Sequence, residues 1–182
     1  MIAPRITSLV AAVALAVPFT IIASGCDEDT VVEVPDEQCG WSSNRELHAW
    51  GLTFRAETEV IGEAPTTIQT IVTATNTWDS EVTLNKPWAG CDVMLRVYLD
   101  RHRDKLVWTE SEYLWATNTA CLAIAEQVTL PPGESRQFAE TTLSASQILG
   151  DSLLPGCYYF EAVTWADDMA FNLGAGSAVL SR

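Results

Sequence analysis

The sequence predicts an all-β protein, an immunoglobulin-like antiparallel β-sandwich of about eight short strands, preceded by an N-terminal signal helix and an acidic tether. Three observations lead to this prediction. After residue 40, apolar residues recur at every second position, which is the period of a strand. Pro-Gly turns stand before two of these runs, and no segment after residue 40 shows a long helical period.

The first 25 residues have the features of an export signal. Arg5 is the only charged residue before Cys26, and the segment 6–22 is almost entirely apolar. The small residues 23–25 then precede Cys26 in the order that a lipoprotein signal peptidase reads before the cysteine is acylated. Ala23 departs from this pattern, because such signals usually carry Leu, Val or Ile at that position. We therefore expect export, with Cys26 as the lipidation site.

Two alternatives to this anchor remain open, namely an uncleaved anchor and secretion without a lipid. A single membrane-spanning helix is also compatible with the length of the apolar segment, although Pro18 lies inside it. Each of these readings places the rest of the chain outside the cytoplasm. The protein is accordingly expected to be exported and anchored to the bacterial cell-envelope membrane.

Residues 26–39 are expected to form an acidic, disordered tether, and residues 40–182 the folded domain. Between Cys26 and Gln38 the chain carries six acids, no base and no aromatic residue. Loss of residues 1–25 leaves nine basic against 24 acidic residues, a net charge of −15. Such a charge repels nucleic-acid phosphates and anionic lipid head groups alike. We therefore expect no nucleic-acid partner, and a membrane link made by the lipid alone.

Alternation of apolar and polar residues marks the strands along the domain. The clearest case is 93–99, where Val93, Leu95 and Val97 alternate with Met94, Arg96 and Tyr98. The wholly charged stretch 100–105 then reads as a hairpin loop. The expected strands are 52–60, 68–74, 82–84, 93–99, 106–108, 122–130, 137–143, 157–165 and 177–180.

Turn-forming residues separate several of these strands. Gly133 and Gly156 each follow a proline, so that Pro presets one turn dihedral and Gly supplies a positive φ. Asn76 and the residues 78–80 carry the side chains typical of a turn. The segment 144–149 is expected to form one helical turn capped by Ser144, and no longer helix is predicted.

Several of these motifs together resemble a known family. They are the strand 68–76 ending in Asn76, the apolar strand 90–98 with the Val107-Trp108 pair after it, the turn 130–135, and Pro155-Gly156 before Tyr158. Their order is similar to that of the BsuPI-like family, named for an intracellular proteinase inhibitor of a Bacillus. The resemblance covers about residues 52–165 and implies an immunoglobulin-like sandwich and inhibition of a serine proteinase. Unlike the cytoplasmic namesake, this chain is exported and carries four cysteines beyond Cys26.

Those four cysteines are Cys39, Cys91, Cys121 and Cys157, an even number in an oxidising compartment, which favours disulfides. Three pairings are possible. We favour Cys91 with Cys121 and Cys39 with Cys157, because a charged hairpin between positions 91 and 121 would bring its two ends together. Zinc is disfavoured, since no two cysteines have the short spacing of a chelating turn.

Gly150-Asp151-Ser152-Leu153 spells the signature of the GDSL esterases, in which the serine is the nucleophile. That chemistry needs a downstream histidine base, but His48 and His102 both precede Ser152. We therefore read 150–153 as a turn and expect no enzyme, no catalytic residue, no metal and no cofactor. His102 is expected at a hydrated hairpin tip.

Seven tryptophans suggest a binding role, because exposed indole rings stack on ligands. Trp108 and Trp165 lie in expected strands and are read as core. Trp78, Trp88 and Trp115 lie in expected loops, so they are the candidate binding residues. Two function classes remain open: a protein-binding module, by resemblance a proteinase inhibitor, and a glycan-binding or structural cell-envelope lipoprotein.

Overall fold

The computed structural model describes residues 39, 46–62, 66–87, 91–122 and 124–182. All of them belong to one compact unit, 33–182. Cys26 and the segment 1–25 lie outside the described residues, as do Trp88 and the tether up to Gln38. Within the described part of the chain, no helix is long and apolar enough to span a membrane.

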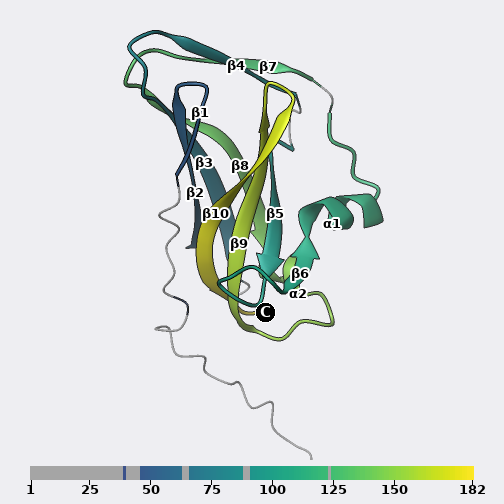
Figure 1. Ribbon diagram of the computed structural model, residues 1–182. Coiled ribbons are helices and arrows are strands. Elements are labelled where there is room, and N and C mark those ends of the chain that lie inside the picture. The colour runs from purple at the N-terminus through teal and green to yellow at the C-terminus, as the bar shows by residue number, and fades with distance from the viewer. Residues whose placement is uncertain (1–38, 40–45, 63–65, 88–90, 123) are drawn as a thin grey trace, which may run out of the picture. The chain divides into compact units, whose positions relative to one another are not determined.

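The described residues form an all-β sandwich, as predicted (Figure 1). One sheet has the strand order β1-β2-β3-β8, and the other has the order β10-β9-β5-β6. A separate two-stranded ribbon pairs β4 with β7, and all pairs are antiparallel. The strands are β1 (Leu47–Ala49), β2 (Leu52–Ile61), β3 (Thr67–Asn76), β4 (Val82–Lys86), β5 (Val93–Tyr98), β6 (Leu106–Thr109), β7 (Glu126–Leu130), β8 (Ser135–Ser144), β9 (Gly156–Ala166) and β10 (Met169–Leu180).

The core lies between the two sheets and is made by the alternating residues that the sequence indicated. Phe54 from β2, Val72 from β3, Leu95 from β5 and Phe160 from β9 are all fully buried in one cluster. Edge-to-face packing of Phe54 against Phe138 of β8, with ring centroids 5.4 Å apart, adds directional contact to this apolar burial. The alternation therefore identifies the buried face of each sheet.

Two short helices complete the domain, α1 (Glu110–Ala116) and α2 (Ala145–Leu149). Helix α2 is the predicted helical turn, and its Ser144 cap forms a full capping box with Gln147. Helix α1 was not expected, and it corrects the prediction that Trp115 lies in a loop. The start of α1 does carry a sequence signal. The Thr109 side chain caps the helix by accepting a hydrogen bond from Glu112 N, and two acidic residues, Glu110 and Glu112, lie in the first turn.

Three strand assignments also differ from the sequence prediction. The short β1 was missed, β7 begins at Glu126 instead of 122, and β10 begins at Met169 instead of 177. In β10, Leu173, Gly174, Ala175 and Gly176 are buried one after another, and the pairing with β9 shifts between Gly174 and Gly176. Burial on both faces and a bulge remove the alternation on which the prediction depended.

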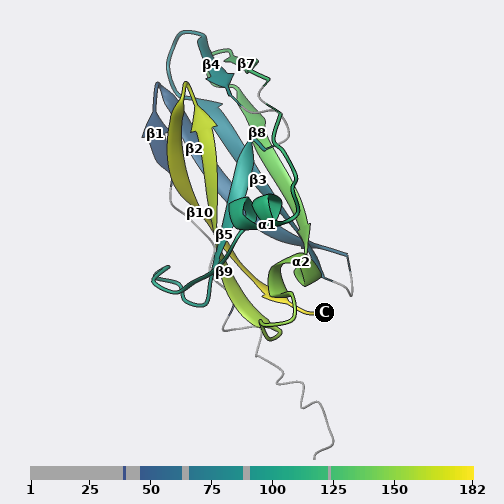
Figure 2. The ribbon, with the colours of Figure 1, turned by 90° about the vertical axis from the view of Figure 1, so that its right-hand side faces the viewer.

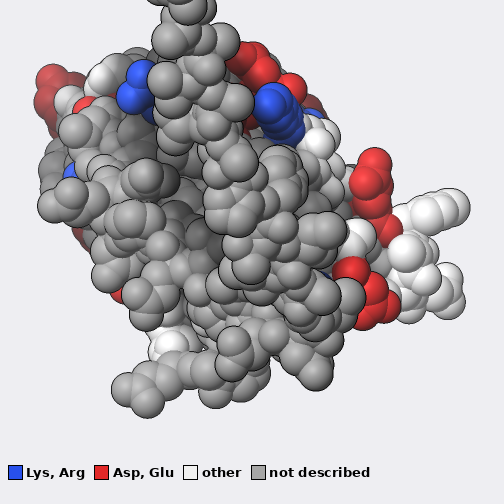
Figure 3. Space-filling model, turned by 90° about the horizontal axis from the view of Figure 1, so that it is seen from below, with Lys and Arg blue, Asp and Glu red and all other residues white. Residues whose placement is uncertain are grey.

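The two ends of the sandwich carry different elements. At one end, opposite the β4-β7 ribbon, α2 and the C-terminus lie side by side (Figures 1 and 2). Arg182 donates hydrogen bonds there to the carbonyls of Gly150 and Leu153. Viewed from that end, acidic and basic side chains of the described residues both lie at the margin of the molecule (Figure 3).

Candidate functional site

Helix α1 carries the most exposed tryptophan of the described residues. Trp115 retains 88% of its surface in solvent. It lines a hollow of about 360 Å³, which we call the Trp115 hollow. The lining residues are Leu114, Trp115, Asn118, Thr119, Ala120 and Cys121. A large apolar ring beside a concave surface is the arrangement that a partner molecule can cover.

A buried carboxylate fixes the start of α1. The Glu110 side chain accepts a hydrogen bond from Leu95 N of β5 at 2.9 Å and another from Thr141 Oγ1 of β8 at 2.9 Å. Burial raises the pKa of this carboxyl, and the two hydrogen bonds only partly oppose the effect. Glu110 thus ties α1 to both sheets, and Gln147 of α2 adds a bond to the Tyr113 hydroxyl.

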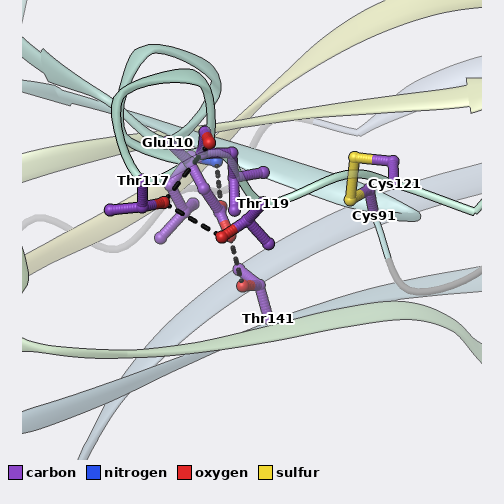
Figure 4. The surroundings of a disulfide bond; sticks show 8 residues. Cys91, Glu110, Thr117, Thr119, Cys121 and Thr141 are labelled. Carbon is purple, nitrogen blue, oxygen red and sulfur yellow. Dashed lines mark hydrogen bonds between the residues drawn. A yellow bond between two sulfur atoms is a disulfide. The ribbon is translucent and has the colours of Figure 1, made fainter.

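The end of α1 is fixed by threonines and a disulfide (Figure 4). Thr117 donates to the carbonyls of Tyr113 and Leu114 and shares a 3.0 Å hydrogen bond with the hydroxyl of Thr119. Two residues further, Cys121 is bonded to Cys91. The hollow is therefore held from both sides by contacts that are formed before any ligand arrives.

An exposed segment follows the hollow. All of its described residues from Leu122 to Gln127 are exposed, including the aliphatic side chains of Leu122 and Ile124. The Cys91–Cys121 bond restrains this segment at its start, and the β4-β7 pairing restrains it at its end. Two exposed aliphatic side chains thus follow the hollow in the chain.

The structure does not bring the three candidate tryptophans together. Trp115 lies on a helix and not on a loop, and Trp88 lies outside the described residues. Trp78 lies in the turn after β3 and is 57% exposed, as a loop residue was expected to be. Its ring rests on Gly51 of the β1-β2 turn, which Figures 1 and 2 place apart from α1. One shared surface at one end of the sandwich is therefore not formed by Trp78 and Trp115.

The four cysteines pair as the sequence favoured. Cys91 is bonded to Cys121, and Cys39 to Cys157 at the start of β9. Cys39 was expected at the end of the tether, but it is buried and linked to β9, so it belongs to the folded domain. Disulfides of this kind are typical of proteins outside the reducing cytoplasm.

Ser152 lies in a turn. Gly150 caps α2 with φ 50°, and Asp151 and Ser152 after it are exposed. The two histidines have other partners, since His48 Nδ1 shares a hydrogen bond with Thr53 and His102 accepts one from Arg101. Over the described residues, no three His, Cys, Asp or Glu side chains are grouped so that they could hold a metal.

A second buried carboxylate was also missed by the sequence analysis. Glu161, on the outer side of β9, pairs with Arg96 at 3.3 Å and Arg103 at 2.6 Å and accepts a bond from the Tyr98 hydroxyl. Burial, followed by the charge of Glu161, raises the pKa of Tyr98. Arg103 reaches Glu161 from the charged hairpin, so this cluster holds the hairpin against the sheet.

Comparisons with known proteins add little to this geometry. No family model and no curated protein match the sequence. A β-glucosidase from Erythrobacter marinus is 16% identical at a TM-score of 0.34 and covers 68% of this chain. A β-glucosidase from Listeria innocua bound to isofagomine is 17% identical at a TM-score of 0.31 over 70% of the chain.

A structural genomics target is 14% identical at a TM-score of 0.32, over 72% of this chain and 87% of its own. The chain spans only 15% and 16% of the lengths of the two glucosidases. Similarities at these TM-scores support no assignment of fold or function.

Proposed function

We propose that this protein is a non-catalytic binding module held outside the cytoplasm by lipid on Cys26, and that the Trp115 hollow binds a protein partner. The exposure of Trp115 beside this restrained hollow is the observation that carries the proposal. Tryptophan is among the residues that contribute most to binding when a partner buries them.

The way the hollow is held favours a binding role. Glu110 anchors one side of it and the Cys91–Cys121 bond anchors the other. A surface that is already ordered loses less conformational entropy on association, which strengthens binding. A protein partner is favoured over a glycan because Leu122 and Ile124 extend the apolar surface beyond the single ring.

A serine proteinase is the proposed partner, by the resemblance to the BsuPI-like family. An inhibitor presents an exposed segment whose ends are held in place. The described residues from Leu122 to Gln127 are exposed, and the Cys91–Cys121 bond and the β4-β7 pairing hold the chain on either side of them. A glycan is the alternative partner, for which Asn118 and Thr119 beside Trp115 would supply the polar contacts.

Replacing Trp115 with Ala should weaken binding of the protein partner by about 2 kcal/mol or more, roughly thirtyfold in Kd. The partner is sought by capture from the organism's own envelope with the lipidated protein, and by inhibition assays of the mature chain against trypsin-like and subtilisin-like proteinases. Leu154→Ala, which removes another exposed apolar side chain outside α1 and outside the lining of the hollow, is the matched control. Equal capture and inhibition by the two variants would contradict the proposal, and retention on polysaccharide that depends on Trp115 would favour the alternative.

The proposed anchor has its own test. Replacing Cys26 with Ser removes the thiol that would be acylated, so fatty-acid labelling should disappear and processing of the signal segment should stop. Metabolic labelling with a radioactive fatty acid and the size of the product on a gel measure the two effects. A Cys26→Ser variant that is labelled like the parent would contradict lipidation at this position.

A further inference from the structure

Trp78 lies flat on a glycine. A Cβ built on Gly51 would approach 2.5 Å from both Cγ and Cε2 of the Trp78 ring, with the shared ring atom Cδ2 closer still. Cδ2 is bonded to three other atoms of the ring plane, so an atom this close to it must lie above or below that plane. One face of the indole therefore rests on the Gly51 backbone, and 57% of the Trp78 surface stays exposed.

The backbone around Trp78 is fixed by hydrogen bonds. Thr77 donates to the Gly51 carbonyl through both its N–H at 2.9 Å and its hydroxyl at 3.0 Å. Trp78 N donates to the side-chain oxygen of the buried Asn76 at 2.9 Å. The ring is thus held in one orientation before any ligand binds, which reduces the entropy cost of stacking.

The β1-β2 turn carries backbone strain that places Gly51 under the ring. Trp50 has φ 52° and Gly51 has φ 73°, the two positive values of a tight hairpin turn. A bulky residue at positive φ is unfavourable, at a cost on the order of 1–3 kcal/mol. Trp50 tolerates this conformation because its ring packs against Phe54 and Phe171, with centroids 6.2 and 5.9 Å away. Such strain is often retained where a site needs a defined shape.

We infer that Trp78, seated on Gly51, is a stacking site for a pyranose ring of a polysaccharide, separate from the Trp115 hollow. The apolar C–H face of a sugar stacks on an open indole face, and its hydroxyls donate to carboxylates. Asp79 and Glu81 follow Trp78 in the chain, and both are exposed. Nucleobases would also stack, but the charge of −15 in the mature chain repels the phosphates that carry them. The inference does not depend on the proposed protein partner.

Sedimentation of the mature chain with insoluble peptidoglycan and with insoluble chitin tests this site. The parent chain should be retained on at least one of the two, and Trp78→Ala should weaken retention at least about tenfold. Gly51→Ala should cause a similar loss, because its methyl group would displace the ring. Leu154→Ala, at an exposed position near the other end of the domain, should bind like the parent chain.

A conservative variant separates loss of the stacking surface from loss of the fold. Trp78→Phe retains a flat ring on Gly51 and should keep part of the retention, and the thermal unfolding of every variant shows whether its fold is intact. The inference is wrong if the parent chain binds neither polysaccharide, or if Trp78→Ala is retained like the parent. It is equally wrong if Trp115→Ala abolishes retention while Trp78→Ala does not.

Discussion

Replacing Asn76 with Asp should destabilise the domain by about 3 kcal/mol or more, since it places a charge against two carbonyls in the interior. Asn76 is only 1% exposed. Its amide nitrogen donates to the carbonyls of Ser80 and Leu130, both at 2.8 Å, and its amide oxygen accepts from Trp78 N. In the Asp variant the bond from Trp78 can remain, but an oxygen would face the two carbonyls.

The size of this effect follows from the position of Asn76 where two turns meet, the turn after β3 and the Pro-Gly turn before β8. Its backbone N–H donates to Glu134, and its carbonyl accepts from Gly133 of the Pro-Gly turn. Asn76→Ala should cost slightly less, about 2–4 kcal/mol, because it leaves the two carbonyls and Trp78 N unpaired but adds no charge. At acidic pH the free energy of unfolding of Asn76→Asp should move toward that of Asn76→Ala. The protonated Asp carboxyl carries no charge and can donate one of the lost hydrogen bonds.

Urea unfolding followed by tryptophan fluorescence measures these losses. Asn172→Asp makes the same chemical change at an exposed position of β10 and should alter the free energy of unfolding by no more than about 0.5 kcal/mol. If Asn76→Asp and Asn172→Asp unfold at the same urea concentration, the hydrogen bonds of Asn76 to the two turns do not stabilise the domain as described.

Removal of the two disulfides should have unequal effects. Cys39 and Cys157 are 118 residues apart in the chain, whereas Cys91 and Cys121 are 30 apart. In the chain-entropy model the longer loop contributes about 5 kcal/mol and the shorter about 3–4 kcal/mol. Double Cys→Ser variants of each pair, which leave no unpaired partner thiol, should lose free energy of unfolding in that order.

A second measurement separates the roles of the two bonds. Cys91→Ser with Cys121→Ser also frees the segment beside the Trp115 hollow, so it should weaken capture of the protein partner. Cys39→Ser with Cys157→Ser should leave that capture unchanged at a temperature where the domain is folded. Equal binding by both double variants would show that the Cys91–Cys121 bond does not order the hollow.

Local patterns were sufficient for most of the strands. In β2, β3 and β5 one side of the strand faces the core, so apolar and polar residues alternate, and the alternation can be read from the sequence. Turn and cap chemistry is equally local, as Gly133 and the Ser144 capping box show. The disulfide pairing could also be predicted, because the charged hairpin between Cys91 and Cys121 was expected to bring its two ends together.

The candidate sites were harder to predict from the sequence. Three tryptophans were named from their positions outside strands, which says nothing of what each ring rests on. Trp115 is exposed because α1 projects it, and Trp78 is oriented by Gly51, 27 residues before it in the chain. Thr109 followed by Glu110 and Glu112 was a readable helix start, whereas nothing local marked Glu110 as buried.

The sequence by itself determined the sandwich class, the strands with one buried face and the turns between them, because each of these depends on neighbouring residues and on the period of burial. The tertiary structure decided where the charged and aromatic side chains act. Glu110 is buried only because Leu95 and Thr141 come from two other strands to bind it. Burial, pKa and ring orientation at such positions depend on contacts between distant segments, and these contacts exist only once the sheets have packed.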